Sequence, residues 1–315
     1  MKITAEEAAA ELKSKDDILI IVHASPDGDT LGCGFALWNA LTALGKQARV
    51  ECSDEFPARF SYLYEGYQPR PFQEKYVVAV DLAATQLLGN RLAHYQDRVD
   101  LCIDHHPSNG LFAKKTCLVP EAAAACEIIY RIICRMEAPI SLSIANCLYT
   151  GIATDTGCFK FSNTTANTHE VAARMFEKGA DYQKINEYLF DTKSKSRIAI
   201  EQQVLSTMEF FCDDRIALIG ITREMIEKTK ADESELDGVS ALPRMIEGVQ
   251  IGITIREKPD GSHKVSVRTT REVDASKICA LFGGGGHARA AGCQLAENYE
   301  NTKRRLVEAC KEFLV

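Results

Sequence analysis

Short apolar runs and amphipathic stretches alternate along the first half of the chain. The apolar runs, which predict β-strands, are DILIIVHA (17–24), ARVEC (48–52), KYVVAVDL (75–82) and RVDLCIDHH (98–106). The helical spacing of apolar residues predicts helices over Leu31–Leu44, Glu121–Glu137 and Leu142–Ala153. Strands that alternate with helices predict an α/β fold, with a parallel sheet and helices on both of its faces. In such sheets, ligands bind at the carboxyl ends of the strands.

The pattern changes near residue 181. Residues 183–212 are charged and helical in pattern, so we predict a helical linker there. Beyond it, RIALIGIT (215–222), VQIGITIRE (249–257) and KVSVRTT (264–270) predict strands, and the Pro-Asp-Gly between the last two predicts a hairpin. A helix closes the chain. We therefore predict a first domain over 1–182, the linker, and a smaller α/β domain over 213–315.

Histidine and aspartate residues recur where the predicted strands of the first domain end. They follow the first strand in HASPDGD, the third strand in VVAVD and the fourth in LCIDHH, and one more lies at a predicted helix end in GIATDTG. In chain order these residues are His23, Asp27, Asp29, Asp81, Asp104, His105, His106 and Asp155. Four separate segments thus bring imidazole and carboxylate groups to the same edge of one sheet.

Each of these residues alone has a plain structural explanation. An aspartate after a strand is usually a turn residue or a helix N-cap, and Asp29 precedes a predicted helix. Together, however, so many like charges would repel one another strongly unless cations neutralised them. Carboxylate and imidazole ligands without thiolate favour Mn²⁺ or Mg²⁺ over structural zinc. There are too many ligands for one ion, which indicates a pair of ions that activates water for attack on phosphorus.

A run of four glycines in LFGGGGHARAAG (281–292) is the second candidate site. The four residues Gly283, Gly284, Gly285 and Gly286 predict a nest of backbone N–H groups, which together with the N-terminus of a following helix would bind an anion. His287 would add a hydrogen-bond donor, and Arg268 in KVSVRTT is a candidate partner for the same phosphate. The alternative is a flexible linker.

Composition and charge restrict the partners. A net charge of −7 argues against a long groove for nucleic acid, because such grooves neutralise many phosphates with Lys and Arg. No apolar run reaches the roughly 20 residues that span a bilayer, and the polar N-terminus does not resemble a targeting signal, so we expect a cytoplasmic protein without a membrane partner. The twelve cysteines are scattered, and we interpret them as small core residues.

Five segments occur in the order seen in the DHH phosphoesterase superfamily, which the chain resembles over essentially its whole length. They are HASPDGDTLG, VAVDLA, IDHHPSN, TGIATDTGCFKFSNTT and GGGGHARAAG. The chain is most similar to the compact group of nanoRNases and phosphatases of 3′-phosphoadenosine-5′-phosphate (pAp). The resemblance implies a DHH domain and a DHH-associated domain, with the active site in the cleft between them.

The resemblance also implies a role for each site residue. His23, Asp27 and Asp81 would hold one Mn²⁺, and a second would be held by Asp29, Asp81, His105 and Asp155, with Asp81 as the bridge. His106 would face the scissile phosphate or orient a ligand, and Asp104 would act beside it. The substrate phosphate would be held by Arg268, Gly283, Gly284, Gly285, Gly286 and His287.

The implied activity is hydrolysis of short RNA oligonucleotides to mononucleotides, removal of the 3′-phosphate from pAp, or both. An alternative with the same metal site is a phosphodiesterase for cyclic di-AMP or linear pApA. A catalytically inactive nucleotide-binding regulator is a third interpretation, which the complete ligand set disfavours. The sequence leaves open the preferred substrate, the direction of RNA degradation, the physiological metal and the oligomeric state, a homodimer included.

Overall fold

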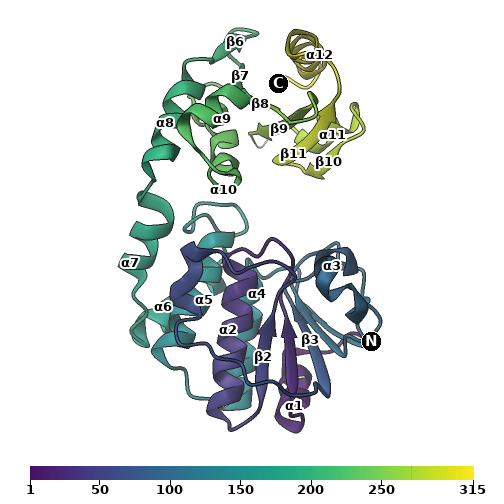
Figure 1. Ribbon diagram of the computed structural model, residues 1–315, viewed down its shortest axis with the longest axis vertical. Coiled ribbons are helices and arrows are strands. Elements are labelled where there is room, and N and C mark those ends of the chain that lie inside the picture. Colours follow the sequence, from purple (N-terminus) through teal and green to yellow (C-terminus); the bar gives the residue numbers. More distant parts are fainter. Residues whose placement is uncertain (271) are drawn as a thin grey trace. The chain divides into compact units, whose positions relative to one another are not determined.

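A five-stranded parallel sheet lies at the centre of the first of two structural units, Met1–Thr192. The computed structural model describes residues 1–270 and 272–315 (Figure 1). The strand order is β2-β1-β3-β4-β5, with every neighbouring pair parallel. The strands are β1 (Ile18–Ile21), β2 (Ala48–Glu51), β3 (Tyr76–Val80), β4 (Leu101–Asp104) and β5 (Lys115–Leu118). The first four confirm the predicted strands, whereas β5 was not predicted.

Both faces of this sheet are covered, as predicted. Along β1, Ile18 and Ile20 belong to the large core formed with helices α1, α2, α4 and α5, and Leu19 and Ile21 belong to a smaller core on the other face. That second face is covered by short helical segments (Figure 1). The α-helices are α1 (Ala5–Ser14), α2 (Gly28–Ala43), α3 (Gly89–Leu92), α4 (Ala125–Met136), α5 (Leu142–Asp155), α6 (Ala166–Glu177) and α7 (Tyr182–Asn186). The remaining turns are 3₁₀ segments over Ala58–Leu63, Thr85–Leu88 and Ala93–Tyr95, and a π-helical turn over Glu187–Asp191.

Helices α2 and α5 pack closely because glycines lie along their contact. A Cβ atom added to Gly32 would come within 2.5 Å of the Cys147 carbonyl oxygen. A Cβ at Gly151 would lie 2.6 Å from the carboxylate of Asp29. This close approach brings the C-terminal end of α5, which carries Asp155, near the N-terminal end of α2, which carries Asp29.

The second unit, Lys193–Val315, is built on a six-stranded sheet of order β10-β11-β9-β8-β7-β6. Among the described strands of this second sheet, only β7 and β8 pair in parallel. The strands are β6 (Glu209–Phe211), β7 (Ile216–Ile221), β8 (Ile251–Glu257), β9 (His263–Thr269), β10 (Gly285–His287) and β11 (Ala290–Leu295). The helices are α8 (Lys195–Leu205), α9 (Arg223–Thr229), α10 (Glu233–Leu236), α11 (Ala275–Ala280) and α12 (Tyr299–Lys311), with 3₁₀ segments over Asp237–Ala241 and Pro243–Met245. Helices α11 and α12 cover one face of this sheet.

The segment predicted as a helical linker needs correction. It contains β6, because Glu209–Phe211 leave the helical path and pair antiparallel with β7. The division between the two structural units falls between Thr192 and Lys193, inside the predicted linker, so α8 belongs to the second unit. No helix in the described part of the chain is both long and apolar enough to cross a membrane.

Candidate active site

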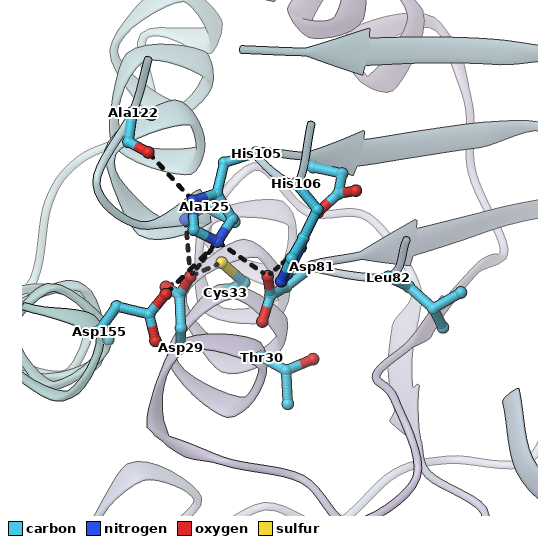
Figure 2. A network of polar contacts seen from close by, with 12 residues as sticks. Asp29, Thr30, Cys33, Asp81, Leu82, His105, His106, Ala122, Ala125 and Asp155 are labelled. Atoms are coloured by element: carbon cyan, nitrogen blue, oxygen red, sulfur yellow. Dashed lines mark hydrogen bonds and ion pairs between the residues drawn. The ribbon is translucent and has the colours of Figure 1, made fainter. Parts of the chain in front are cut away.

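The histidine and aspartate residues that follow the strands do gather at the carboxyl edge of the first sheet. His23 comes two residues after β1, and Asp104 ends β4. Asp81 directly follows β3, and Figure 2 shows its side chain beside those of His105 and His106. Asp155 is the last residue of α5, as predicted. Asp81 has a left-handed backbone (φ 53°), which is uncommon for a residue with a side chain and turns the chain sharply at the end of β3.

Asp81 is the centre of the group. Its carboxylate is 3% exposed, and its Oδ2 atom lies 3.7 Å from His23 Nε2, while its Oδ1 atom lies 3.5 Å from His105 Nε2. Two sets of side chains can each surround an ion: His23, Asp27 and Asp81 on one side, and Asp29, His105 and Asp155 on the other. Within each set the ligand atoms lie within 4.8 Å of one another. The carboxylate of Asp81 therefore belongs to the first set and also faces His105 of the second.

His23 and His105 have the ring orientation that metal-binding histidines usually have. The Nδ1 atom of His23 lies 2.8 Å from the Ala24 carbonyl, and that of His105 lies 3.0 Å from the Ala122 carbonyl. A carbonyl only accepts, so Nδ1 must carry the proton in each ring. When either ring is neutral, its Nε2 lone pair therefore faces the carboxylates, which is the tautomer that binds a metal through Nε2.

Asp29 has a second role that the sequence did not indicate. Its side chain is fully buried and accepts hydrogen bonds from the backbone N–H groups of Ala125 (2.6 Å) and Cys126 (3.0 Å), at the first turn of α4. Helix α4 has no side-chain N-cap of its own, so the carboxylate from α2 replaces one. The N-cap of α2 itself is Asp27, which accepts from the N–H groups of Asp29 and Thr30. The expectation that Asp29 fits a cap of the following helix is therefore wrong, because α2 already begins at Gly28.

His106 and Asp104 form a pair at the edge of this group, and His106 Nδ1 also lies 3.6 Å from Asp81 Oδ1, so that His106, His105 and Asp81 are a further possible ligand set. The Nδ1 atom of His106 lies 2.8 Å from Asp104 Oδ1, and Asn109 donates to the other oxygen of Asp104 at 2.6 Å. Asp104 is fully buried, so both of its oxygens are occupied inside the protein. This leaves the Nε2 atom of His106 as the group that can reach a ligand, because the ring is 37% exposed. Sequence reasoning missed Asn109, although it follows the Asp-His-His triplet by only three residues.

Without a cation, the negative charges of these carboxylates repel one another and shift their pKa values. Burial raises the pKa of Asp81 well above its ordinary value, and the charges of Asp29 and Asp27 raise it further. Burial and the charge of Asp155 raise the pKa of Asp29 to about 7. Burial lowers the pKa of His105, but the carboxylate of Asp155, 3.4 Å from Nε2, and the charge of Asp29 outweigh this and raise the pKa to about 9. A divalent cation would remove this repulsion.

The residues present fit a pair of divalent ions. Asp81 Oδ1 and His105 Nε2 are buried side-chain atoms with no hydrogen-bond partner, although buried polar atoms nearly always have one. A metal ion would satisfy both atoms. The donors are carboxylate oxygens and imidazole nitrogens, which suit Mn²⁺ or Mg²⁺. The thiols of Cys33 and Cys126 also face Asp29, but burial raises the pKa of both thiols well above the ordinary value, so they stay protonated.

We expect the stabilisation by Mn²⁺ to grow with pH. In the folded chain without metal, Asp29 keeps a proton that the unfolded chain has already released, so this group makes stability fall as pH rises from about 4 towards 7. The raised pKa of Asp81 acts in the same direction. The raised pKa of His105 acts in the same direction from about pH 6.5 to 9. The measurement is the difference in Tm between Mn²⁺ and chelator, taken from about pH 5 to 8. A difference that stays constant or narrows over this range would contradict the assignment.

In the second unit, the predicted phosphate-binding residues are only partly brought together. A pocket of about 290 Å³ has Arg268 and Gly285 in its wall. Gly283, Gly284, Gly286 and His287 are not among its lining residues. Arg256 and Lys264 line the same pocket and were missed, although the β8–β9 register pairs them directly and places them on the same face as Arg268.

The predicted helix after the glycine run does not exist. Gly285–His287 form β10, which pairs antiparallel with β11, and the nearest helix, α11, precedes the run. Gly283 turns the chain with a positive φ of 71°, and a Cβ at Gly284 would lie 2.2 Å from the Gly292 carbonyl oxygen. The run is therefore a tight turn into a hairpin, and it is neither a loose linker nor the start of a helix.

The chain matches known proteins along its whole length. The family model described as DHH family, N-terminal domain, matches residues 17–152, and that of the DHHA1 domain matches residues 218–315. The bifunctional oligoribonuclease and PAP phosphatase NrnA of Thermus thermophilus is 31% identical over 320 residues, which cover 100% of this chain and 94% of that protein. The cyclic-di-AMP phosphodiesterase GdpP of Geobacillus thermodenitrificans is 23% identical over 96% of this chain and 48% of its own length.

A solved structure has a similar fold over nearly the whole chain. The crystal structure of an exopolyphosphatase-related protein from Bacteroides fragilis has a TM-score of 0.88 and 26% identity, covering 98% of this chain and 96% of that one. Both domain models match in the order that the motifs indicated, and the Thermus thermophilus relative is matched over nearly its full length. The chain therefore belongs to the DHH family, with an N-terminal DHH domain followed by a DHHA1 domain.

Proposed function

We propose that this phosphoester hydrolase of the DHH family uses two divalent ions, Mn²⁺ above all, to cleave short oligoribonucleotides to mononucleotides and to remove the 3′-phosphate from pAp. The position of Asp81 supports this most strongly. One buried carboxylate presents one oxygen to His23 and the other to His105, as a bridge between two ions requires. The substrates are those for which the Thermus thermophilus relative is named.

In this proposal His23, Asp27 and Asp81 hold one ion, and Asp29, Asp81, His105 and Asp155 hold the other. Such a pair of ions supplies an activated water and neutralises charge on the departing oxygen. The carbonyls of Ala24 and Ala122 keep His23 and His105 in the metal-binding tautomer. His106 directs its Nε2 atom to the phosphate, and Asp104 is a positioning residue that accepts the Nδ1 proton of His106.

The decisive experiment compares turnover of pAp, a dinucleotide RNA, pApA and cyclic di-AMP in Mn²⁺ and in excess chelator. We expect pAp and the dinucleotide to be hydrolysed fastest, and all activity to disappear with chelator and return with Mn²⁺. Full activity in excess chelator would remove the two-ion site from the reaction. A strong preference for cyclic di-AMP would replace the proposed substrates.

That second outcome is the alternative function, a phosphodiesterase for cyclic di-AMP or linear pApA. It is favoured by the similarity to the cyclic-di-AMP phosphodiesterase GdpP, which extends over 96% of this chain. The same metal ligands would serve either substrate. A catalytically inactive nucleotide-binding regulator is disfavoured, since an inactive member would be expected to have lost some of the ligands that this chain retains.

Arg268→Ala tests whether the second domain holds a substrate phosphate. A charge-assisted hydrogen bond to phosphate contributes roughly 1.5–3 kcal/mol, so kcat/KM for pAp or a dinucleotide should fall about ten- to a hundredfold. Bis-p-nitrophenyl phosphate, which is too small to reach a second site, should be hydrolysed as before. We propose the same role for the glycine turn and His287, so His287→Ala should show the same split between substrates with a smaller loss.

Arg304→Ala is the matched control, because Arg304 is an exposed arginine on α12, a helix that packs on the opposite face of the same sheet. It should leave kcat/KM unchanged for every substrate. If Arg268→Ala lowered kcat/KM equally for the nucleotides and for bis-p-nitrophenyl phosphate, Arg268 would be needed for the fold or for the chemical step. No loss on either would leave the pocket without a role in this reaction.

A further inference from the structure

The chain reverses direction immediately after Asp155. Gly157, Cys158 and Phe159 have consecutive left-handed backbones, with φ of 55°, 58° and 64°. Two of the three carry side chains, for which this conformation is unfavourable and is kept only when the surroundings enforce it. The enforcing contacts are hydrogen bonds from Cys158 N to the Ala153 carbonyl (2.7 Å) and from Phe161 N to the Thr156 carbonyl (2.9 Å).

This turn carries two phenylalanines, of which one is half-buried and the other exposed to solvent. Phe159 is half-buried and stacks on His169, with ring centroids 5.2 Å apart and an angle of 20° between the planes. Phe161 is 59% exposed, one of the most exposed large apolar side chains of the first unit. Its ring lies directly over Gly157, where a Cβ atom would come within 2.4 Å of its Cζ atom. A glycine is therefore needed at 157 both for the backbone conformation and for the position of the ring.

The turn that carries Phe161 begins directly after a candidate metal ligand, Asp155, and hydrogen bonds fix it on both sides of the ring. The turn is attached before the ring at Thr156 and after it at Asn163, whose amide donates to the Asp155 and Ala123 carbonyls at 3.1 Å each. Ala123 lies in the segment that leads into α4, beside the residues that bind Asp29. Asp155 itself belongs to one of the two ligand sets. A loop that needed only to connect α5 and α6 would not require this strain or this exposed ring.

We propose that Phe161 is a stacking platform for a nucleobase of the substrate whose phosphate lies at the candidate metal site. The inference rests on the proposed function, and it adds the feature that selects nucleotides over phosphates without a base. Bases stack on exposed aromatic side chains with little regard to sequence, because every base presents a flat face. We therefore expect Phe161 to favour nucleotides in general and not one particular base.

The test combines a change in the protein with a change in the substrate. Phe161→Ala should lower kcat/KM for a diadenylate RNA about ten- to a hundredfold, the range expected for loss of one base–aromatic stack. Two analogues of the dinucleotide, each with hydrogen in place of one of the two bases, should show which base stacks on Phe161. At the position that stacks, removing the base from the wild-type substrate should cost as much as the mutation, and the two changes together should cost no more than either alone.

Two further variants make the result specific. Leu142→Ala removes another exposed apolar side chain, 54% exposed, from the opposite end of α5, roughly 20 Å from Asp155 along the helix. It should leave all rates unchanged. Phe161→Trp should keep activity and add a fluorophore to a chain whose only other tryptophan is Trp38, and AMP should quench the added emission.

Each outcome decides the proposal. Equal losses in Phe161→Ala on the complete and both base-free dinucleotides would show that the ring only supports the turn. Unchanged rates in Phe161→Ala, together with emission from the Phe161→Trp variant that AMP does not quench, would show that the ring does not meet a base. If the wild type failed to hydrolyse any dinucleotide, the proposed function would fail, while quenching by AMP in Phe161→Trp would still report on the stacking separately.

Discussion

Asp81→Asn should lower kcat at least about a thousandfold, or about 4 kcal/mol of transition-state stabilisation. The physical reason is that Asn keeps the shape of Asp81 but removes the charge that both proposed ions share. The two carboxylate oxygens lie 3.7 Å from His23 and 3.5 Å from His105, so one change weakens both ligand sets. The measurement is the steady-state rate on a dinucleotide in saturating Mn²⁺, together with the number of ions bound.

The stability of the same variant distinguishes lost chemistry from lost structure. Because burial and neighbouring charges raise the pKa of Asp81, a neutral side chain should relieve repulsion when no metal is bound. The Tm of Asp81→Asn in chelator should therefore equal or exceed that of the wild type, and Mn²⁺ should no longer raise it as much. Asp97→Asn, a change at an exposed turn residue, is the control and should alter neither property. Near-normal turnover with two bound ions would show that Asp81 is not the bridge.

The placement of these ligands followed from a rule about sheets that the sequence alone could supply. Continuous apolar runs such as ILII predicted strands buried on both faces, and the carboxyl ends of parallel strands meet at one edge. His23, Asp81 and Asp104 were therefore expected to converge, and they do. The position of Asp155 at a helix end was also predictable, because the apolar spacing of α5 stops there.

Other features depend on pairing between distant segments, which a local pattern does not reveal. The strand β5 has only four residues, two of them partly exposed, so its sequence KTCL lacks a clear signal. The stretch HARAAG resembles the start of a helix because alanine favours helices, but pairing with β9 makes its second half a strand. The cap that Asp29 provides for α4 joins residues 96 positions apart and so could not be read from the sequence.

Asp29 should therefore have two separable effects when it is changed. Asp29→Ala removes both the ligand and the acceptor for the N–H groups of Ala125 and Cys126, which are buried and would lose their partner. Loss of a cap costs about 1–2 kcal/mol, and a buried N–H left unpaired adds to this. We expect a Tm several degrees below that of the wild type in chelator, faster amide exchange at the start of α4, and at least a hundredfold lower activity.

Asp29→Asn should separate the two roles, because its amide oxygen still accepts one of the two hydrogen bonds while the charge is gone. It should be as inactive as Asp29→Ala but clearly more stable. Asp27→Asn is the matched comparison, since Asn caps a helix as well as Asp does and Asp27 caps α2 from a half-exposed position. That variant should keep the wild-type Tm in chelator and lose only metal affinity and activity. Equal Tm values for Asp29→Ala and Asp29→Asn would mean that the carboxylate does not support α4, and normal Mn²⁺-dependent activity in either would remove Asp29 from the ligands.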